Sequence, residues 1–140
     1  MKEVKGDIWD YHDKGHWIVI PTNGSIREDG ACVMGRGVAL QAKQRFPNLP
    51  HQLGELIRER GNRLFAFPKY RIITYPVKHN WREKADIVLI EKSCQSLAQS
   101  SGPEFCMVRP GCGNGRLNWK DVKPILEKYL DDRFVVVNPD

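Results

Sequence analysis

The sequence lacks the features that mark metal-binding, secreted and membrane proteins. Its four cysteines form no C-x-x-C pair, and no histidine stands near them at the spacing of a zinc site. Structural zinc is therefore not expected, and free thiols in a reducing compartment fit better than disulfides. No apolar run approaches the roughly 20 residues that cross a bilayer, and the amino terminus alternates in charge where a secretory signal would be apolar. We expect a cytoplasmic protein that does not associate with membranes.

A run of basic residues is also missing, although the net charge is +5 and the pI is about 9.1. This charge suits a phosphate-bearing partner, but a mildly basic surface explains it equally well. Hydrophobic residues make up 41% and charged residues 28% of the chain, a composition that excludes a wholly disordered protein. With no linker and no internal repeat, residues 1–140 are expected to form a single domain and a monomer.

Short apolar segments alternate with segments of helical periodicity. Strands are expected at 2–5, 16–21, 64–67, 71–75, 105–109 and 133–138. Helices are expected around 38–46, 53–57, 87–97 and 122–129. The last helix should be capped by Asp121, with Pro124 in its first turn, and Pro68 predicts a tight turn between two antiparallel strands. The pattern predicts an α/β fold, a mixed sheet with helices on both faces.

Two glycine-rich loops follow predicted strands and precede helices. The first extends over residues 22–37 and the second over residues 110–117. Open α/β sheets bind ligands at the carboxyl ends of their strands, and a helix N-terminus offers free N–H groups to an anion. Glycine lets the backbone approach such an anion closely. Tight turns without a ligand would explain one such loop, but two of them favour phosphate binding.

Neither loop matches a standard phosphate motif. The segment from Gly30 to Gly37 has the glycine spacing of a P-loop, but Arg36 and Gly37 replace the Lys and the Ser or Thr that would hold magnesium. In the second loop, Arg116 stands where a dinucleotide fingerprint needs its third glycine. A kinase and a Rossmann dehydrogenase are therefore excluded, and neither a metal ion nor a cofactor is expected.

Short motifs at four places nevertheless form a familiar series: Gly6-Asp7-Ile8 after the first strand, Asn23 after the next, Met34-Gly35-Arg36-Gly37-Val38-Ala39 opening a helix, and Gly111-Cys112-Gly113 before the last helix. In this order they resemble the macrodomain, an ADP-ribose-binding family. Further segments, Phe46-Pro47, Tyr75 to Trp81 and Gly111 to Trp119, resemble its DarG-type DNA ADP-ribosyl glycohydrolases most. This branch also contains the terminal ADP-ribose protein glycohydrolase. The resemblance implies a three-layer α/β/α macrodomain with a central mixed, mostly parallel six-stranded sheet.

The resemblance also implies a role for each matching residue. Asp7 would accept a hydrogen bond from the adenine amino group, Ile8 would line the base pocket, and Asn23 would bind the distal ribose. Without the resemblance, Asp7 and Asn23 would be interpreted as turn residues. The diphosphate would be held by two sets of backbone groups: those of Val33, Met34, Gly35 and Gly37, and those of Gly111, Cys112, Gly113, Asn114, Gly115, Arg116 and Leu117.

Lys78 stands where the related hydrolases carry their catalytic lysine. Without that match it would be interpreted as a solvated surface charge. An amine can attack an electrophilic sugar carbon, or form a Schiff base with a ring-opened aldehyde, once burial or nearby cations lower its pKa. Gly115 replaces the aspartate that works with this lysine on acyl-linked ADP-ribose in the human enzyme of the branch. This departure favours a nucleic-acid or nucleoside adduct over a protein ester.

Three functions remain open at this stage. A metal-independent ADP-ribosyl hydrolase using Lys78 ranks first, acting on a modified nucleic-acid base, such as one in DNA, or on a protein. A non-catalytic ADP-ribose reader would keep the loops without needing Lys78. A nucleic-acid-binding module could stack bases on Trp81 or Trp119, although both would ordinarily be core aromatics. Cys112 is tied to no histidine by any motif and is expected to be a packing residue.

The resemblance also implies a ligand and a protein partner. ADP-ribose or an ADP-ribosylated substrate is the expected ligand. A cognate ADP-ribosyltransferase is a further partner that it suggests. The toxin-neutralising role of the DarG branch does not follow from these residues alone.

Overall fold

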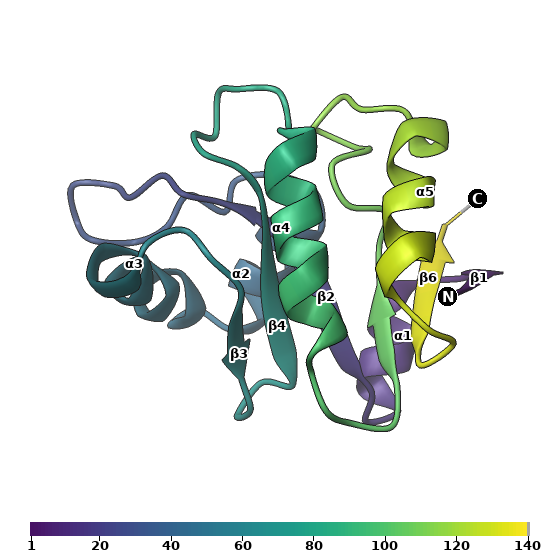
Figure 1. Ribbon diagram of the computed structural model, residues 1–140. Helices are drawn as coiled ribbons and strands as arrows, with labels where there is room; N and C mark the ends of the chain where they lie inside the picture. The colour runs from purple at the N-terminus through teal and green to yellow at the C-terminus, as the bar shows by residue number, and fades with distance from the viewer. Residues whose placement is uncertain (140) are drawn as a thin grey trace.

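A computed structural model describes residues 1–139 and builds them around one six-stranded sheet (Figure 1). The strands lie in the order β1-β6-β5-β2-β4-β3, and every neighbouring pair is parallel except the hairpin of β3 and β4. Their bounds are β1 (Lys2–Lys5), β2 (Trp17–Asn23), β3 (Phe65–Phe67), β4 (Ile72–Lys78), β5 (Phe105–Met107) and β6 (Phe134–Asn138). The predicted mixed, mostly parallel sheet and its antiparallel hairpin are confirmed.

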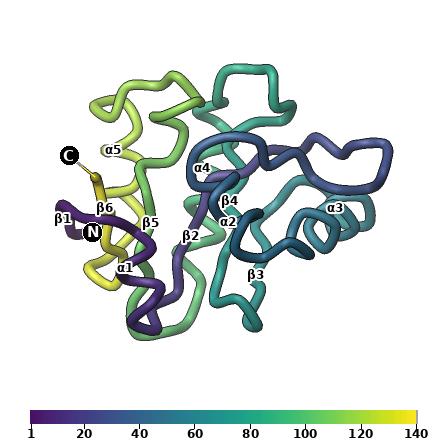
Figure 2. The backbone as a smooth tube through the Cα atoms, turned by 180° about the vertical axis from the view of Figure 1, so that it is seen from behind, coloured from purple at the N-terminus to yellow at the C-terminus, as the bar shows by residue number. Residues whose placement is uncertain are grey.

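Helices cover both faces of this sheet. They are α1 (Ile8–Asp13), α2 (Gly37–Arg45), α3 (Leu49–Arg60), α4 (Ile87–Ala98) and α5 (Trp119–Tyr129). The helices α4 and α5 pack on one face, whereas α1 and α2 lie on the other with α3 beside them (Figures 1 and 2). The three-layer arrangement is therefore confirmed. No helix in the described residues is long and apolar enough to cross a membrane.

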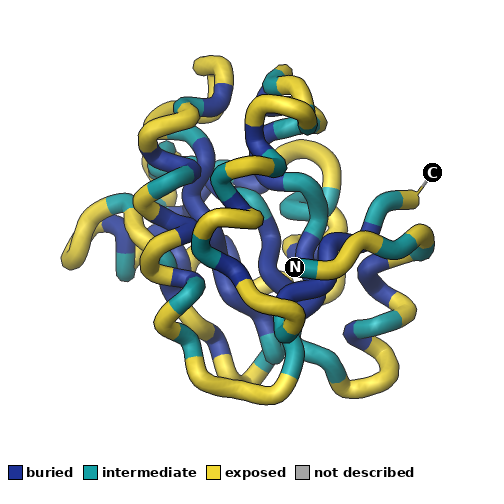
Figure 3. Tube along the Cα trace, turned by 45° about the vertical axis from the view of Figure 1, so that its right-hand side comes forward, coloured by how far each residue is buried: buried dark blue, intermediate teal, exposed yellow. Residues whose placement is uncertain are grey.

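An apolar core fills the space on each side of the sheet. Ile18 and Ile20 of β2 point into the core beneath α1, α2 and α3, and the intervening Val19 points into the core beneath α4 and α5. Because successive side chains of a strand face opposite sides, a strand buried on both faces is apolar throughout. Buried backbone accordingly runs through the middle of the molecule, with exposed segments around it (Figure 3).

The start of α5 differs from the prediction. The helix begins at Trp119 with Asn118 as its N-cap, so Pro124 lies inside the helix rather than in its first turn. The predicted cap, Asp121, instead donates its backbone N–H to the Asn118 carbonyl at 3.0 Å. Trp119 packs against the core, as Val122 and Leu126 do, and this extended apolar face outweighs the backbone hydrogen bond that proline removes.

Other elements also differ from the prediction. The sequence analysis missed α1, a six-residue helix that Asp7 caps by accepting a hydrogen bond from the Trp9 N–H at 2.9 Å. Helices this short carry too little periodicity to predict. Both β2 and β4 extend beyond their expected ends, so Asn23 and Lys78 are the last residues of their strands. The two residues are partners in the register, immediately after a β-bulge.

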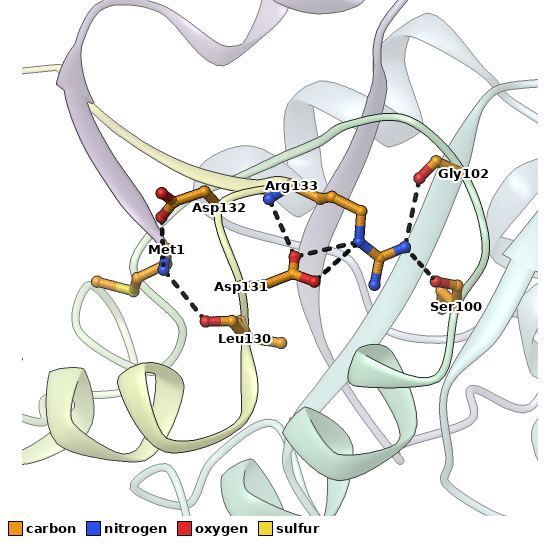
Figure 4. Close-up of polar contacts among 7 residues, drawn as sticks. All are labelled: Met1, Ser100, Gly102, Leu130, Asp131, Asp132 and Arg133. Atoms are coloured by element: carbon orange, nitrogen blue, oxygen red, sulfur yellow. Dashed lines mark hydrogen bonds and ion pairs between the residues drawn. The ribbon is translucent and has the colours of Figure 1, made fainter.

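At the amino ends of β1, β5 and β6, polar contacts join the loops (Figure 4). The Arg133 guanidinium donates to Asp131 at 3.1 Å, and to the carbonyls of Ser100 at 2.9 Å and Gly102 at 3.3 Å. The N-terminal ammonium lies 3.3 Å from the Asp132 carboxylate. These contacts hold the loops together at the end of the sheet opposite the carboxyl ends of its parallel strands.

Candidate functional site

One large cleft, of about 1580 Å³, opens at the carboxyl ends of the parallel strands. The loops that follow β4 and β5 stand at this end of the molecule (Figure 1). The structure brings every predicted site residue to this cleft: Asp7, Ile8, Asn23, Val33, Met34, Gly35, Gly37, Lys78, Gly111, Cys112, Gly113, Asn114, Gly115, Arg116 and Leu117. Their individual roles in binding remain predictions.

The two glycine-rich loops approach each other across the cleft. A Cβ atom placed on Gly37, the first residue of α2, would lie 3.4 Å from Nδ2 of Asn114 in the second loop. A Cβ atom on Gly35 or Gly113 would have no other atom within 4 Å. The first turn of a helix leaves backbone N–H groups without helical partners. Unfilled space thus borders the backbone where the sequence predicts an anion.

Other glycines in the second loop are packed tightly. Gly111 has a φ of 76°, and a Cβ there would lie 2.7 Å from Cδ1 of Ile90. A Cβ on Gly115 would clash with the carbonyl oxygen of Gly111 and lie 2.8 Å from Cβ of Ala85. The next residue, Arg116, has a left-handed φ of 64°, which is uncommon for a residue other than glycine. Position 115 therefore has no room for a side chain such as an aspartate.

Lys78 ends β4 with its amine at the cleft. Its Nζ donates to the Trp81 carbonyl at 3.3 Å, and its own carbonyl accepts from Nδ2 of Asn62 at 2.9 Å. Partial burial lowers the pKa of Lys78 most, and the positive charges of Arg116 and Arg36 lower it further. All three causes disfavour the ammonium form. The neutral amine required of a nucleophile is thus more accessible here than on an ordinary surface lysine.

Asn23 organises the first loop from within. Its Nδ2 donates to the Val33 carbonyl at 2.9 Å, and its Oδ1 accepts from the Ser25 N–H at 3.0 Å. These bonds tie the end of β2 to the segment that leads into α2. Its Oδ1 also accepts from Sγ of Cys32 at 3.8 Å. An amide has two N–H donors, so the second N–H of Asn23 is the group that could serve the predicted ribose contact.

The cleft is strongly basic, although the sequence contains no run of basic residues. Among residues 1–139, seven basic side chains line it against one acidic residue, Asp7. The basic residues are Arg27, Arg36, Lys43, Lys78, Arg82, Arg109 and Arg116. They come from separate segments, and only the fold gathers them. The sequence left two explanations for the net charge of +5, a phosphate-bearing partner and a mildly basic surface. In the fold, this positive charge is focused where a phosphate would bind.

All four cysteines are free thiols, as the sequence predicts. Burial raises the pKa of the Cys112 thiol to about 11, so at neutral pH it is protonated and a poor nucleophile. Its side chain packs against the core beneath α4 and α5, which confirms its interpretation as a packing residue.

One group of possible metal ligands could not be recognised from residue spacing in the sequence. His16, Glu104 and Cys106 place their donor atoms within 4.8 Å of one another. They come from the starts of β2 and β5, which are distant in the sequence but neighbours in the sheet. This group lies at the opposite end of the sheet from the cleft, and none of its members lines the cleft.

Comparison with known proteins places this geometry in a family. No family model matches the chain. The chain is 32% identical to the DNA ADP-ribosyl glycohydrolase of Thermus aquaticus over 114 residues, 71% of its length. It is also 32% identical to the DNA ADP-ribosyl glycohydrolase of Mycobacterium tuberculosis, over 125 residues and 76% of this chain. It spans about a third of either relative, 31% and 35% respectively.

Solved structures agree with the sequence relatives. The macrodomain of Mycobacterium tuberculosis DarG superposes with a TM-score of 0.80 at 23% identity, covering 99% of this chain and 97% of that one. The macrodomain of Thermus aquaticus DarG gives a TM-score of 0.76 at 26% identity, covering 98% and 96%. The sheet order, the helical layers and the cleft between glycine loops define a macrodomain. Within that class, the chain belongs to the DarG type.

Proposed function

We propose that this chain removes ADP-ribose from a modified nucleic-acid base, with Lys78 as its catalytic residue. One observation carries the proposal: an amine whose pKa is lowered by partial burial, and further by Arg116 and Arg36, ends a strand inside a basic cleft between two glycine loops. The name of the relatives, DNA ADP-ribosyl glycohydrolase, supports the same reaction class.

ADP-ribose would lie across the full cleft. Its adenine would occupy the end formed by Asp7 and Ile8, and its diphosphate would lie between the two glycine loops, where basic side chains and open backbone meet. The distal ribose would then lie near Asn23 and Lys78, which are register partners on neighbouring strands. A DarTG protein from Thermosipho africanus that shares this fold was solved in complex with ADP-ribose; it matches at a TM-score of 0.78 and 18% identity, over 99% of this chain and 42% of that one.

The proposed reaction needs only Lys78 and water. The neutral amine bonds to the anomeric carbon of the distal ribose while the bond to the base nitrogen breaks. The leaving nitrogen keeps that electron pair and takes the proton that the amine loses. Water then releases ADP-ribose and regenerates the amine. Attack on the closed sugar and a Schiff base with the ring-opened sugar give the same products.

Gly115 indicates which bond between ADP-ribose and its target is cleaved. Because the loop leaves no space for a side chain there, a carboxylate at this position cannot assist hydrolysis of an acyl ester. A base-linked adduct is therefore the preferred substrate over a glutamate ester. Such an adduct requires an ADP-ribosyltransferase that modifies nucleic acid, and we propose such an enzyme as the cognate partner of this chain.

A substrate panel tests the proposal. The protein would be incubated, with EDTA present, with thymidine-linked and guanosine-linked ADP-ribosyl DNA and with a glutamate-linked ADP-ribosyl peptide. Release of ADP-ribose from a DNA substrate, faster than from the peptide, is the expected result. Tight binding of ADP-ribose without release from any substrate would instead identify a non-catalytic reader. Activity that appears only when a metal ion is restored would contradict the metal-free reaction.

A further inference from the structure

The two tryptophans near the cleft have different environments. Trp119 is half-buried and packs against the core, and its Nε1 donates to Glu3 at 2.9 Å. Trp81 is 44% exposed, one of few large apolar side chains in the described residues that face water, and it lines the cleft. The interpretation of both as core aromatics holds for Trp119 and is wrong for Trp81. Single exposed apolar side chains are common on protein surfaces, so what distinguishes Trp81 is its place in the lining of the cleft.

The backbone of Trp81 is fixed beside the proposed catalytic amine. Its N–H donates to Oγ of Ser25 at 2.9 Å, and its carbonyl accepts from Nζ of Lys78 at 3.3 Å. A Cβ on Gly24 would lie 2.8 Å from the carbonyl oxygen of His79, so the first loop supports this segment at close range. The Trp81 segment is thereby held at the reaction centre.

The cleft is both large and basic. Its volume of about 1580 Å³ exceeds the roughly 300–1,000 Å³ of ordinary small-molecule pockets. The guanidinium carbon of Arg82 lies 5.0 Å from the centre of the Trp81 ring, so a positive charge accompanies the aromatic surface. Aromatic rings with neighbouring cations are the means by which proteins hold unpaired bases and their phosphates.

We propose that Trp81 is the stacking platform for the base that carries ADP-ribose, and that Arg82 contacts a phosphate of the same strand. This inference rests on the proposed function and makes its substrate a single strand. A base within a duplex stacks on its neighbours and must leave that stack to reach a side chain. A nucleic-acid strand matches the positive charge of the cleft better than a protein surface does.

Binding to a fluorescently labelled ADP-ribosyl single-stranded oligonucleotide tests the platform. Trp81→Ala should weaken binding about tenfold, whereas Trp81→Phe should retain most of the affinity. Affinity for free ADP-ribose, measured by calorimetry, should change less than twofold in both variants. Val88→Ala is the control, since Val88 is 60% exposed and does not line the cleft.

Two results of this experiment would overturn the platform. One is unchanged oligonucleotide affinity in Trp81→Ala. The other is intact oligonucleotide binding together with lost binding to a purified DNA ADP-ribosyltransferase, which would make Trp81 part of a protein interface. If the wild-type protein binds the oligonucleotide through Trp81 but releases no ADP-ribose, the proposed function fails while this inference stands.

Salt dependence tests Arg82 separately. A side chain that neutralises one phosphate of a single strand contributes about 0.7 to the slope of log affinity against log salt. Arg82→Gln should reduce the slope by about that amount. Lys84→Gln, which removes the same charge two residues away and outside the cleft, should leave the slope unchanged. Equal slopes in Arg82→Gln and the wild-type protein would exclude the phosphate contact.

Discussion

The two ends of the sheet use charge in opposite ways. At the amino ends, Arg133 and the N-terminal ammonium are paired with Asp131 and Asp132 (Figure 4). At the carboxyl ends, Arg116 and Arg36 stand close enough to Lys78 to add to the lowering of its pKa that partial burial causes. Charge that is satisfied within the protein adds stability, whereas charge left facing a cleft favours an anionic ligand.

The same contrast divides the glycines of the second loop. Gly111 and Gly115 have no space for a side chain, so they set the shape of the loop. Gly113 borders open space, where the backbone can approach a ligand. One loop thus contains positions that determine folding and a position that can change binding alone.

The largest effect on ADP-ribose binding is expected for Gly113→Glu. A Cβ on residue 113 has no neighbouring atom within 4 Å, and the glutamate carboxylate places a negative charge at the predicted diphosphate position. Repulsion between like charges in such a site costs several kcal/mol, so ADP-ribose binding should weaken about 100-fold, roughly 2.7 kcal/mol. Calorimetry measures this loss, and the thermal midpoint should stay near that of the wild-type protein. Undiminished binding would mean that the loop does not hold the diphosphate.

Gly115→Ala should instead lower stability. Its methyl group clashes with Gly111 and Ala85, and overpacking of this kind costs about 1–3 kcal/mol. Denaturant unfolding measures the change, with Gly35→Ala as a control that has no atom within 4 Å of the new methyl group. Equal stability of the two variants would show that the loop yields more easily than its packing indicates.

At the other end of the sheet, Arg133→Met should reduce the free energy of unfolding by about 1–2 kcal/mol. The substitution removes hydrogen bonds to Asp131, Ser100 and Gly102. Affinity for ADP-ribose should not change, because Arg133 does not line the cleft. A large loss of affinity would show that the two ends of the sheet are coupled.

The smallest effect concerns pH. The reaction needs the neutral amine, so the rate should rise with pH and level off below 10.5, the ordinary pKa of lysine, because burial and two arginines lower the pKa of Lys78. Arg36→Gln removes one of those charges and should move the profile toward higher pH. Single-turnover rates across the pH range measure the shift, and a profile that moved to lower pH would contradict the assigned cause.

Sequence reasoning predicted the sheet and the glycine loops well because both leave local patterns. Strand β2 is apolar on both faces, and the loops combine glycines with the ends of strands. It missed α1 because six residues carry little periodicity. It could not predict the focused basic charge or the exposure of Trp81, since both depend on segments that only the fold brings together.

Lys78→Ala, measured for both turnover and ADP-ribose affinity, tests the central claim most directly. We expect release of ADP-ribose from an ADP-ribosyl oligonucleotide to be abolished, while ADP-ribose affinity changes by less than about tenfold, roughly 1.4 kcal/mol. Lys78→Arg should behave alike, because a guanidinium keeps the charge but does not supply a neutral amine. Lys84→Ala, outside the cleft, is the control. Full hydrolase activity in Lys78→Ala would contradict the account.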